Sequence, residues 1–176
     1  MKIWIAKPDS NNYSSLVRVN TDVSSVFFQG QSVKNEWKVK EFKKDNKLIP
    51  LGDFPGSVVL PSMSEVAVKK LYPLIKDDVE LLEIMVDKEK FFFINIVSVL
   101  DAIDYKNSTY KTFSDGRIYR FTNYSFIENR IKNHNIFKII DKKTSLFPFV
   151  SDEFVKTVKN EKLNGFEFEL IWDSGE

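Results

Sequence analysis

The sequence predicts an α+β fold in which a mainly antiparallel sheet, built from hairpins, is accompanied by two principal helices. Two pairs of strand-like runs are joined by short polar segments, residues 87–90 and 114–117, as is typical of β-hairpins. Two other segments begin at serines, Ser62 and Ser151, and continue with apolar residues at helical spacing. The expected strands outnumber the helices and do not alternate regularly with them, which favours this arrangement over repeated βαβ units.

The first 44 residues indicate short strands. Ile3 and Ile5 alternate with their neighbours, and a β-rich run, Leu16–Val19, follows the turn-forming residues 9–12. The segment Asn35–Phe42 also alternates, with Trp37 on the face opposite the lysines. This alternation predicts a half-exposed strand.

Residues 45–56 contain turn formers throughout, so they cannot form a regular ladder. We expect an ordered loop there, because Leu51 and Phe54 favour burial.

The first helix is predicted from the capping-box spacing Ser62–Glu65, in which a serine hydroxyl accepts a free backbone N–H. Pro73 lacks a backbone donor, so it is expected to kink or shorten the last turn before Asp77–Asp78 ends the helix. The buried face is expected to comprise Ala67, Leu71, Leu74 and Ile75.

The middle of the chain predicts two hairpins. Val79–Val86 and Phe91–Val97 are expected to form the central sheet. Tyr110–Phe113 and Ile118–Phe121 flank Asp115-Gly116, a strong hairpin signal because both residues tolerate positive φ.

The C-terminal part predicts a buried strand, Ile136–Ile140, while Tyr124–Asn133 fits either a short helix or a strand. Ser151 caps a second helix, and Asn164-Gly165 would end it with a left-handed residue. This helix buries Phe154, Val155 and Val158, and the last strand has one apolar face, made of Phe166, Phe168 and Leu170. Residues 173–176 are expected to fray.

Composition indicates one compact domain spanning residues 1–176, because no repeat or Pro/Gly/Ser linker divides the chain. The formal charge of +1 is too small for a general attraction to nucleic acid or anionic membrane. The absence of cysteine fits a reducing cytoplasm. No signal-type segment follows Met1, and no apolar run approaches the roughly 20 residues of a membrane span. We therefore expect a soluble intracellular protein.

The residues needed for common enzyme chemistry are missing. The single histidine, His134, stands in a polar segment without a second histidine or any cysteine, and is interpreted as a solvated turn residue. The scattered glycines form no phosphate-binding loop. We expect no catalytic residues, no metal site and no cofactor.

Two alternative functions remain open from the residues. Asp53, Asp101 and Asp104 could support a metal-dependent hydrolase if their carboxylates converged, although turn capping is the favoured interpretation. Lysine clusters and the run Phe91–Phe93 could contact nucleic acid, although a solvated face and a core strand are favoured. The clustered lysines are Lys38, Lys40, Lys43, Lys44, Lys142 and Lys143.

Several short segments, taken in order, resemble immunity protein family eleven of bacterial polymorphic toxin systems over about residues 50–172. They are Gly52–Pro55, Ser64–Ile75, Glu80–Leu82, Phe93–Ile96, Leu100–Asp104, Ile136–Lys138, Val150–Phe154 and Leu163–Phe168. The positions that match are of structural types: turn glycines, a cap and core aromatics. They are Gly52, Gly165, Ser151, Phe137, Phe154, Phe166 and Phe168.

The resemblance implies a cytoplasmic, non-enzymatic antidote that binds and neutralises a cognate secreted toxin, encoded next to it, by covering the toxin's active site or substrate groove. It implies neither nucleic acid nor membrane as partner. Neither the toxin-binding residues nor the oligomeric state follow from the sequence.

Overall fold

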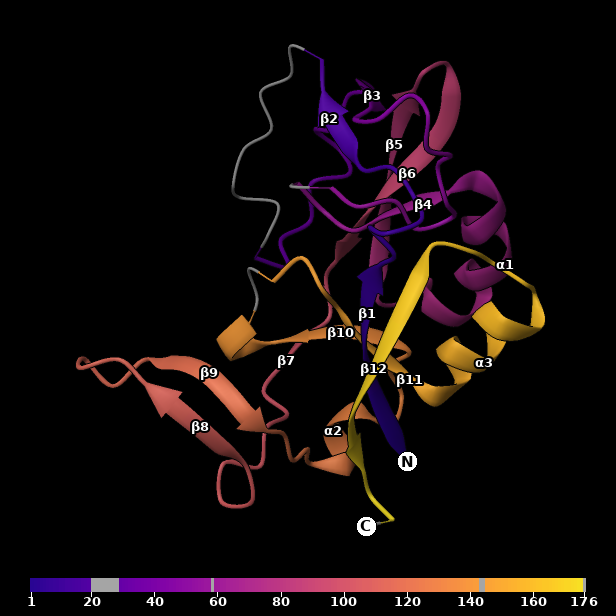
Figure 1. The fold of residues 1–176 in the computed structure, drawn as a ribbon. Coiled ribbons are helices and arrows are strands. Elements are labelled where there is room, and N and C mark those ends of the chain that lie inside the picture. Colours follow the sequence, from indigo (N-terminus) through magenta and orange to yellow (C-terminus); the bar gives the residue numbers. More distant parts are fainter. Residues whose placement is uncertain (20–28, 58, 143–144, 176) are drawn as a thin grey trace.

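The computed structural model describes residues 1–19, 29–57, 59–142 and 145–175 (Figure 1). Sheet I has the strand order β12-β1-β11-β10-β7, sheet II the order β2-β3-β5-β6-β4, and β8 pairs with β9 alone. The strands are β1 (Lys2–Pro8), β2 (Leu16–Arg18), β3 (Lys40–Lys44), β4 (Ser62–Ser64), β5 (Val79–Val86), β6 (Glu89–Ile96), β7 (Val99–Leu100), β8 (Thr109–Thr112), β9 (Ile118–Asn123), β10 (Ile136–Ile139), β11 (Phe149–Ser151) and β12 (Phe166–Asp173).

The helices are α1 (Glu65–Ile75), α2 (Glu128–Ile131) and α3 (Asp152–Asn160), with a 3₁₀ turn, η2 (Ile140–Lys142). Most strand pairs are antiparallel, whereas β3–β5 and β10–β7 are parallel. The predicted α+β class, with α1 and α3 as its main helices, is confirmed.

Sheet I joins the two ends of the chain, because β1 pairs with β12 along its whole length. A bulge places Trp172 opposite Ile3 and Leu170 opposite Trp4, so Ile171 has no partner. The bulge turns Trp172 to the other face and leaves Leu170 exposed. The predicted continuous apolar face of the last strand is therefore wrong beyond Phe168.

The prediction that the chain frays from residue 173 onward is wrong for Asp173 and Ser174. Asp173 is still paired in β12, and the backbone N–H of Ser174 donates to the carbonyl of Met1. The two ends of the chain consequently lie close together (Figure 1).

Sheet II is centred on the predicted hairpin β5–β6. Its turn residues Asp87 and Lys88 both have positive φ, 48° and 76°, which matches the right-handed twist of a two-residue hairpin. The predicted strand Asn35–Phe42 is mostly wrong, because residues 34–36 form a turn and pairing begins at Lys40. The indole of Trp37, which directly follows this turn, donates to the carbonyl of Glu83 at 2.8 Å and so holds the segment against β5.

Helix α1 begins two residues later than the capping-box spacing suggests. Ser64 accepts the backbone N–H of Ala67 at 3.0 Å, whereas the buried Ser62 lies in β4 and donates to the carbonyl of Pro55. The helix ends at Ile75, two residues after Pro73.

Helix α3 has the predicted cap, because Ser151 accepts the backbone N–H of Phe154 at 3.1 Å. Its left-handed end is Lys162, with φ of 55°, and not Gly165. The bonds Lys162 to Lys159 and Leu163 to Val158 close this end as a Schellman motif. Gly165, with φ of 77°, instead forms the turn into β12. The ambiguous segment Tyr124–Asn133 contains the short helix α2.

Three groups of buried side chains hold these elements together. Helices α1 and α3 lie side by side (Figure 1) and share one group with strands of both sheets, including β6, β10 and β11. A second group fills the other side of sheet II around Phe93. A third lies between sheet I and the residues around Phe126. Phe137 and Phe154 are fully buried, as expected, and Phe166 and Phe168 pack against the first group.

Candidate functional site

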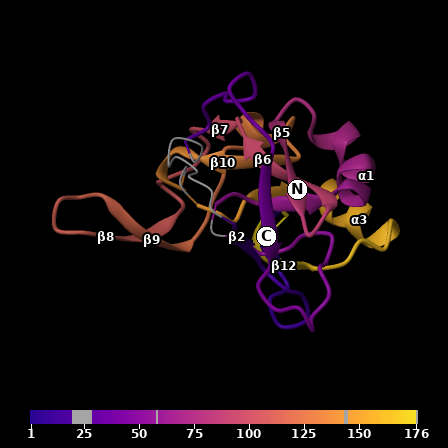
Figure 2. The same ribbon diagram turned by 90° about the horizontal axis from the view of Figure 1, so that it is seen from above.

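The hairpin β8–β9 projects from the rest of the molecule as an arm, which we define as residues 109–123 (Figures 1 and 2). It forms a separate two-stranded sheet. Every residue of β8 is exposed, and in β9 only Phe121 is buried. A two-stranded hairpin gains little stability by itself, so this arm depends on its attachment to the body.

Aromatic rings attach the arm. Phe121 stacks on Tyr124 with centroids 4.9 Å apart, and Tyr124 stacks on Phe126 at 5.9 Å. At the same end, Ser108 donates to the carbonyl of Ser125 and accepts the backbone N–H of that residue. The arm therefore has a packed base and an exposed outer part.

The outer part presents aromatic side chains to solvent. Tyr110, Phe113 and Tyr119 are 40%, 51% and 55% exposed. Phe113 meets Tyr119 edge to face at 5.3 Å, and the Arg117 guanidinium lies 5.6 Å from the centre of the Phe113 ring. Aromatic and arginine side chains of this kind are enriched at the energetic centres of protein interfaces.

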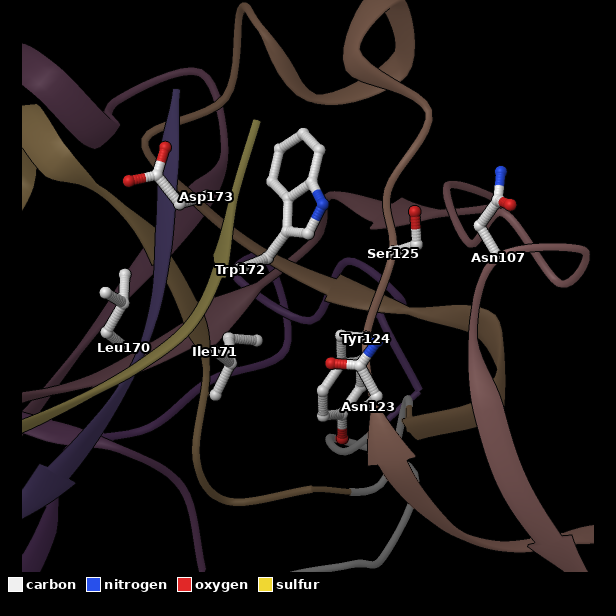
Figure 3. Close-up of a pocket in the computed structure, with 8 residues that line it drawn as sticks. All are labelled: Asn107, Asn123, Tyr124, Ser125, Leu170, Ile171, Trp172 and Asp173. Carbon is white, nitrogen blue, oxygen red and sulfur yellow. The ribbon is translucent and has the colours of Figure 1, made fainter. Parts of the chain in front are cut away.

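A hollow of about 610 Å³ lies between the base of the arm and strand β12 (Figure 3). Residues 170–173 form one side, and Asn107 with residues 123–125 forms the other. Leu170 is available to this hollow because the bulge in β12 ends the alternation of its side chains.

A second hollow, of about 670 Å³, lies between the other side of the arm and the turn η2. Tyr105, Tyr110 and Ile140 contribute apolar surface to it. The Tyr105 hydroxyl donates to the Asp141 carboxylate at 2.7 Å, and burial together with this bond raises the pKa of Tyr105 to about 12. The arm is thus flanked by two open depressions.

The three candidate carboxylates are each used locally. Asp104 accepts the backbone N–H groups of Lys106 and Asn107, and the Asn107 amide that bonds it holds its pKa below the usual value. Asp101 pairs with Arg130 at 2.8 Å.

Asp53 accepts the Ser64 hydroxyl at 2.5 Å and the backbone N–H of Asn164. Throughout the part of the chain that the structure describes, no group of three acidic or histidine side chains could hold a metal ion.

The interpretation of His134 as a solvated turn residue is wrong. Its Nδ1 lies 2.5 Å from the buried carboxylate of Asp78, which also accepts the Ser98 hydroxyl and the backbone N–H of Asn135. Asn135 in turn accepts the Ser151 hydroxyl at 2.6 Å. No local pattern in the sequence indicates this network, because its members come from segments far apart in the chain.

The network does not form a hydrolytic triad. In such a triad the serine donates to histidine, whereas Ser98 here donates to Asp78. Its bonds join the end of α1 to β10 and the cap of α3, which indicates a structural role.

The lysine clusters do not form one surface. Lys38 and Lys43 are exposed near sheet II, and Lys142 donates to the carbonyl of Tyr119 on the arm, while Lys143 lies outside the described residues. Phe91 and Phe93 belong to the core of sheet II, which confirms the run as a core strand.

Lys138 is a charged residue that sequence reasoning missed. It lies in β10, where all four residues are buried, and is itself 2% exposed. Burial lowers its pKa from 10.5 to about 8. The sequence signal that could have identified it is its position inside the predicted buried strand Ile136–Ile140, whose other residues are apolar.

Residues 78–173 match the model of a family described as Immunity protein family (Imm11). The match covers more than half of the chain, from β5 to β12, and includes the arm, both hollows and the Asp78 network. Two of the resembling segments, Gly52–Pro55 and Ser64–Ile75, precede it. No curated protein matched the chain. None of the helices in the described ranges has the length and apolar character needed to cross a bilayer.

Proposed function

Because the chain belongs to the Imm11 immunity protein family, we propose that it binds and neutralises a cognate secreted bacterial toxin by protein–protein contact. In this proposal the protein catalyses no reaction. It acts in the cytoplasm of the cell that makes the toxin, and the toxin gene lies beside its own. Neutralisation then depends on a surface of this protein that is complementary in shape and charge to a surface of the toxin.

The observation that carries the proposal is the projecting arm within the family-matched residues. Phe113 and Tyr119 at its outer part are exposed large rings, and they contribute little to the core of the free protein. Stable complexes bury roughly 800 Å² on each partner. Residues of the arm line both hollows, so a partner that grips the arm would also contact them.

The shape of the arm suits insertion into a groove. Its base is fixed by the stacked rings of Phe121, Tyr124 and Phe126, so its conformation is organised before binding and little freedom is lost on association. A toxin whose substrate groove received this arm would be unable to bind substrate.

A carboxylate-based hydrolase receives no support from the geometry, because Asp53 and Asp104 each cap local backbone N–H groups and Asp101 pairs with Arg130. Binding of nucleic acid is a second candidate function, and one observation favours it: the arm has exposed aromatic rings and exposed cations. The low formal charge of +1 argues against it.

Co-expression tests the proposal. The toxin encoded beside this gene is expressed in a sensitive host with or without the full chain, and growth and co-purification are measured. Restored growth and a stable complex are expected. Equal killing in both strains, with no complex, would contradict the proposal.

A shortened-arm variant tests the surface. Tyr110 and Phe121 lie directly opposite each other, so residues 111–120 can be replaced by Asn-Gly, which forms a two-residue turn. We expect this variant to fold but to lose protection. Full protection by it would show that the toxin binds elsewhere.

A further inference from the structure

We propose that the arm recognises an acidic surface of its protein partner, and that Lys111 and Arg120 provide the complementary charge. This inference rests on the proposed function and specifies the chemistry of the partner.

The first observation is the register of the arm. Lys111 lies directly opposite Arg120 in the β8–β9 pair, and both side chains are exposed. Two like charges in this arrangement repel each other and destabilise a hairpin. An acidic residue at either position would have given an attractive pair, so this pair weakens the free arm.

The second observation is that the neighbouring acids are already engaged. Asp115, the one acid of the arm, pairs with Arg117 at 2.8 Å. Asp141 accepts the Tyr105 hydroxyl and Asp104 caps its own turn, so both keep their charge, but neither pairs with Lys111 or Arg120. Neither Lys111 nor Arg120 forms an ion pair with any residue that the structure describes. Residues 109–123 contain three cations, Lys111, Arg117 and Arg120, and one acid, Asp115, so the arm carries an excess of two positive charges.

A third cation reinforces the positive charge. The Lys142 ammonium group donates to the carbonyl of Tyr119 at 3.3 Å, which places it beside β9. Carboxylates of a partner would relieve the repulsion between these groups on binding, and would speed association through long-range attraction.

A protein partner fits better than nucleic acid. Phe113 and Tyr119 meet edge to face, and Arg117 lies over the Phe113 ring, so part of the ring surface on which bases would stack is already covered. Aromatic rings beside exposed cations instead match a protein groove whose surface combines apolar side chains with carboxylates.

Single charge reversals test the inference. Lys111→Glu and Arg120→Glu each turn the like-charge pair into an opposite-charge pair. Lys69→Glu on α1, which lies on the other side of the molecule in both views (Figures 1 and 2), makes the same change of charge and is the control. Each variant is titrated with the toxin encoded beside this gene at 50 and 300 mM salt.

We expect both arm variants to bind at least about tenfold more weakly at low salt, with a smaller difference at high salt because ions screen exposed charges. Their melting temperatures should equal or exceed that of the wild type, since the repulsion is gone. The control should bind like the wild type. A purely structural role would instead lower melting temperature and affinity together.

The outcomes separate the two proposals. Failure of the wild-type chain to bind or protect would overturn the proposed function and this inference with it. Wild-type binding that neither arm reversal weakens would overturn the acidic surface alone. Binding of single-stranded RNA or DNA oligonucleotides at 50 mM salt, lost in both arm variants, would also overturn it by assigning these cations to phosphate.

Discussion

The two predicted hairpins of this protein are alike in sequence but opposite in environment. Both β5–β6 and β8–β9 combine aromatic and β-branched residues around a short polar turn. In β5–β6 these side chains form the core of sheet II, with Phe93 0% exposed. In β8–β9 only Phe121 is buried, and Phe113 is 51% exposed.

The difference shows how stability and recognition are divided in this molecule. Apolar side chains of β5–β6 remove surface from water during folding, which stabilises the body. The aromatic side chains of the arm remain in water in the free protein, so their apolar surface is available to a partner. Substitutions in β5–β6 should therefore lower the free energy of unfolding, whereas substitutions in the arm should lower the affinity for the toxin.

The largest expected effect is in the buried hairpin. Phe93→Ala removes a ring that contacts Phe42 at 4.9 Å, and should lower the free energy of unfolding by about 3 to 5 kcal/mol. Phe113→Ala in the arm is the matched comparison and should change it by less than about 0.5 kcal/mol. Urea denaturation measures both. Equal losses would show that the arm belongs to the folding core.

The next effect concerns the buried carboxylate of the body. Asp78→Ala leaves the Ser98 hydroxyl, His134 and the backbone N–H of Asn135 without their acceptor. We expect a loss of about 3 kcal/mol in unfolding free energy. Asp78→Asn keeps one acceptor oxygen and should lose less. If denaturation midpoints do not move, the network is not structural.

The effect of Lys138 depends on pH. Its folded pKa, about 8, lies below its usual 10.5, so the unfolded chain binds more protons between these values and wild-type stability rises with pH there. Lys138→Met should add as much as about 3 kcal/mol at pH 7. This advantage should shrink from about pH 8 to pH 10. A constant difference over that range would contradict the assigned pKa.

Local patterns predicted much of the fold. Turn chemistry located both hairpins, and the hydroxyl of Ser151 identified the start of α3. Errors arose where a distant partner decided the outcome. The Trp37 indole bonds to β5 and prevents an early strand, and pairing with β1 creates the bulge at Ile171. No periodicity in one segment contains that information.

The candidate site was less predictable for the same reason. Asp115-Gly116 indicated the hairpin, but alternation cannot tell whether its rings face a core or solvent. Tyr110 and Phe113 would have been equally suitable for burial. Likewise, the contact between His134 and Asp78 joins residues 56 positions apart, and only the fold brings them together.

The most direct test of the account measures toxin affinity and stability on the same variant. Phe113→Ala with Tyr119→Ala removes the outer rings of the arm, and Tyr72→Ala on α1, whose side chain is 41% exposed, is the control. We predict at least about a hundredfold loss of affinity for the toxin encoded beside this gene. The unfolding free energy should remain within about 0.5 kcal/mol of the wild type, and the control should be unchanged. Unaltered affinity of the double variant would contradict the assignment of the arm as the binding surface.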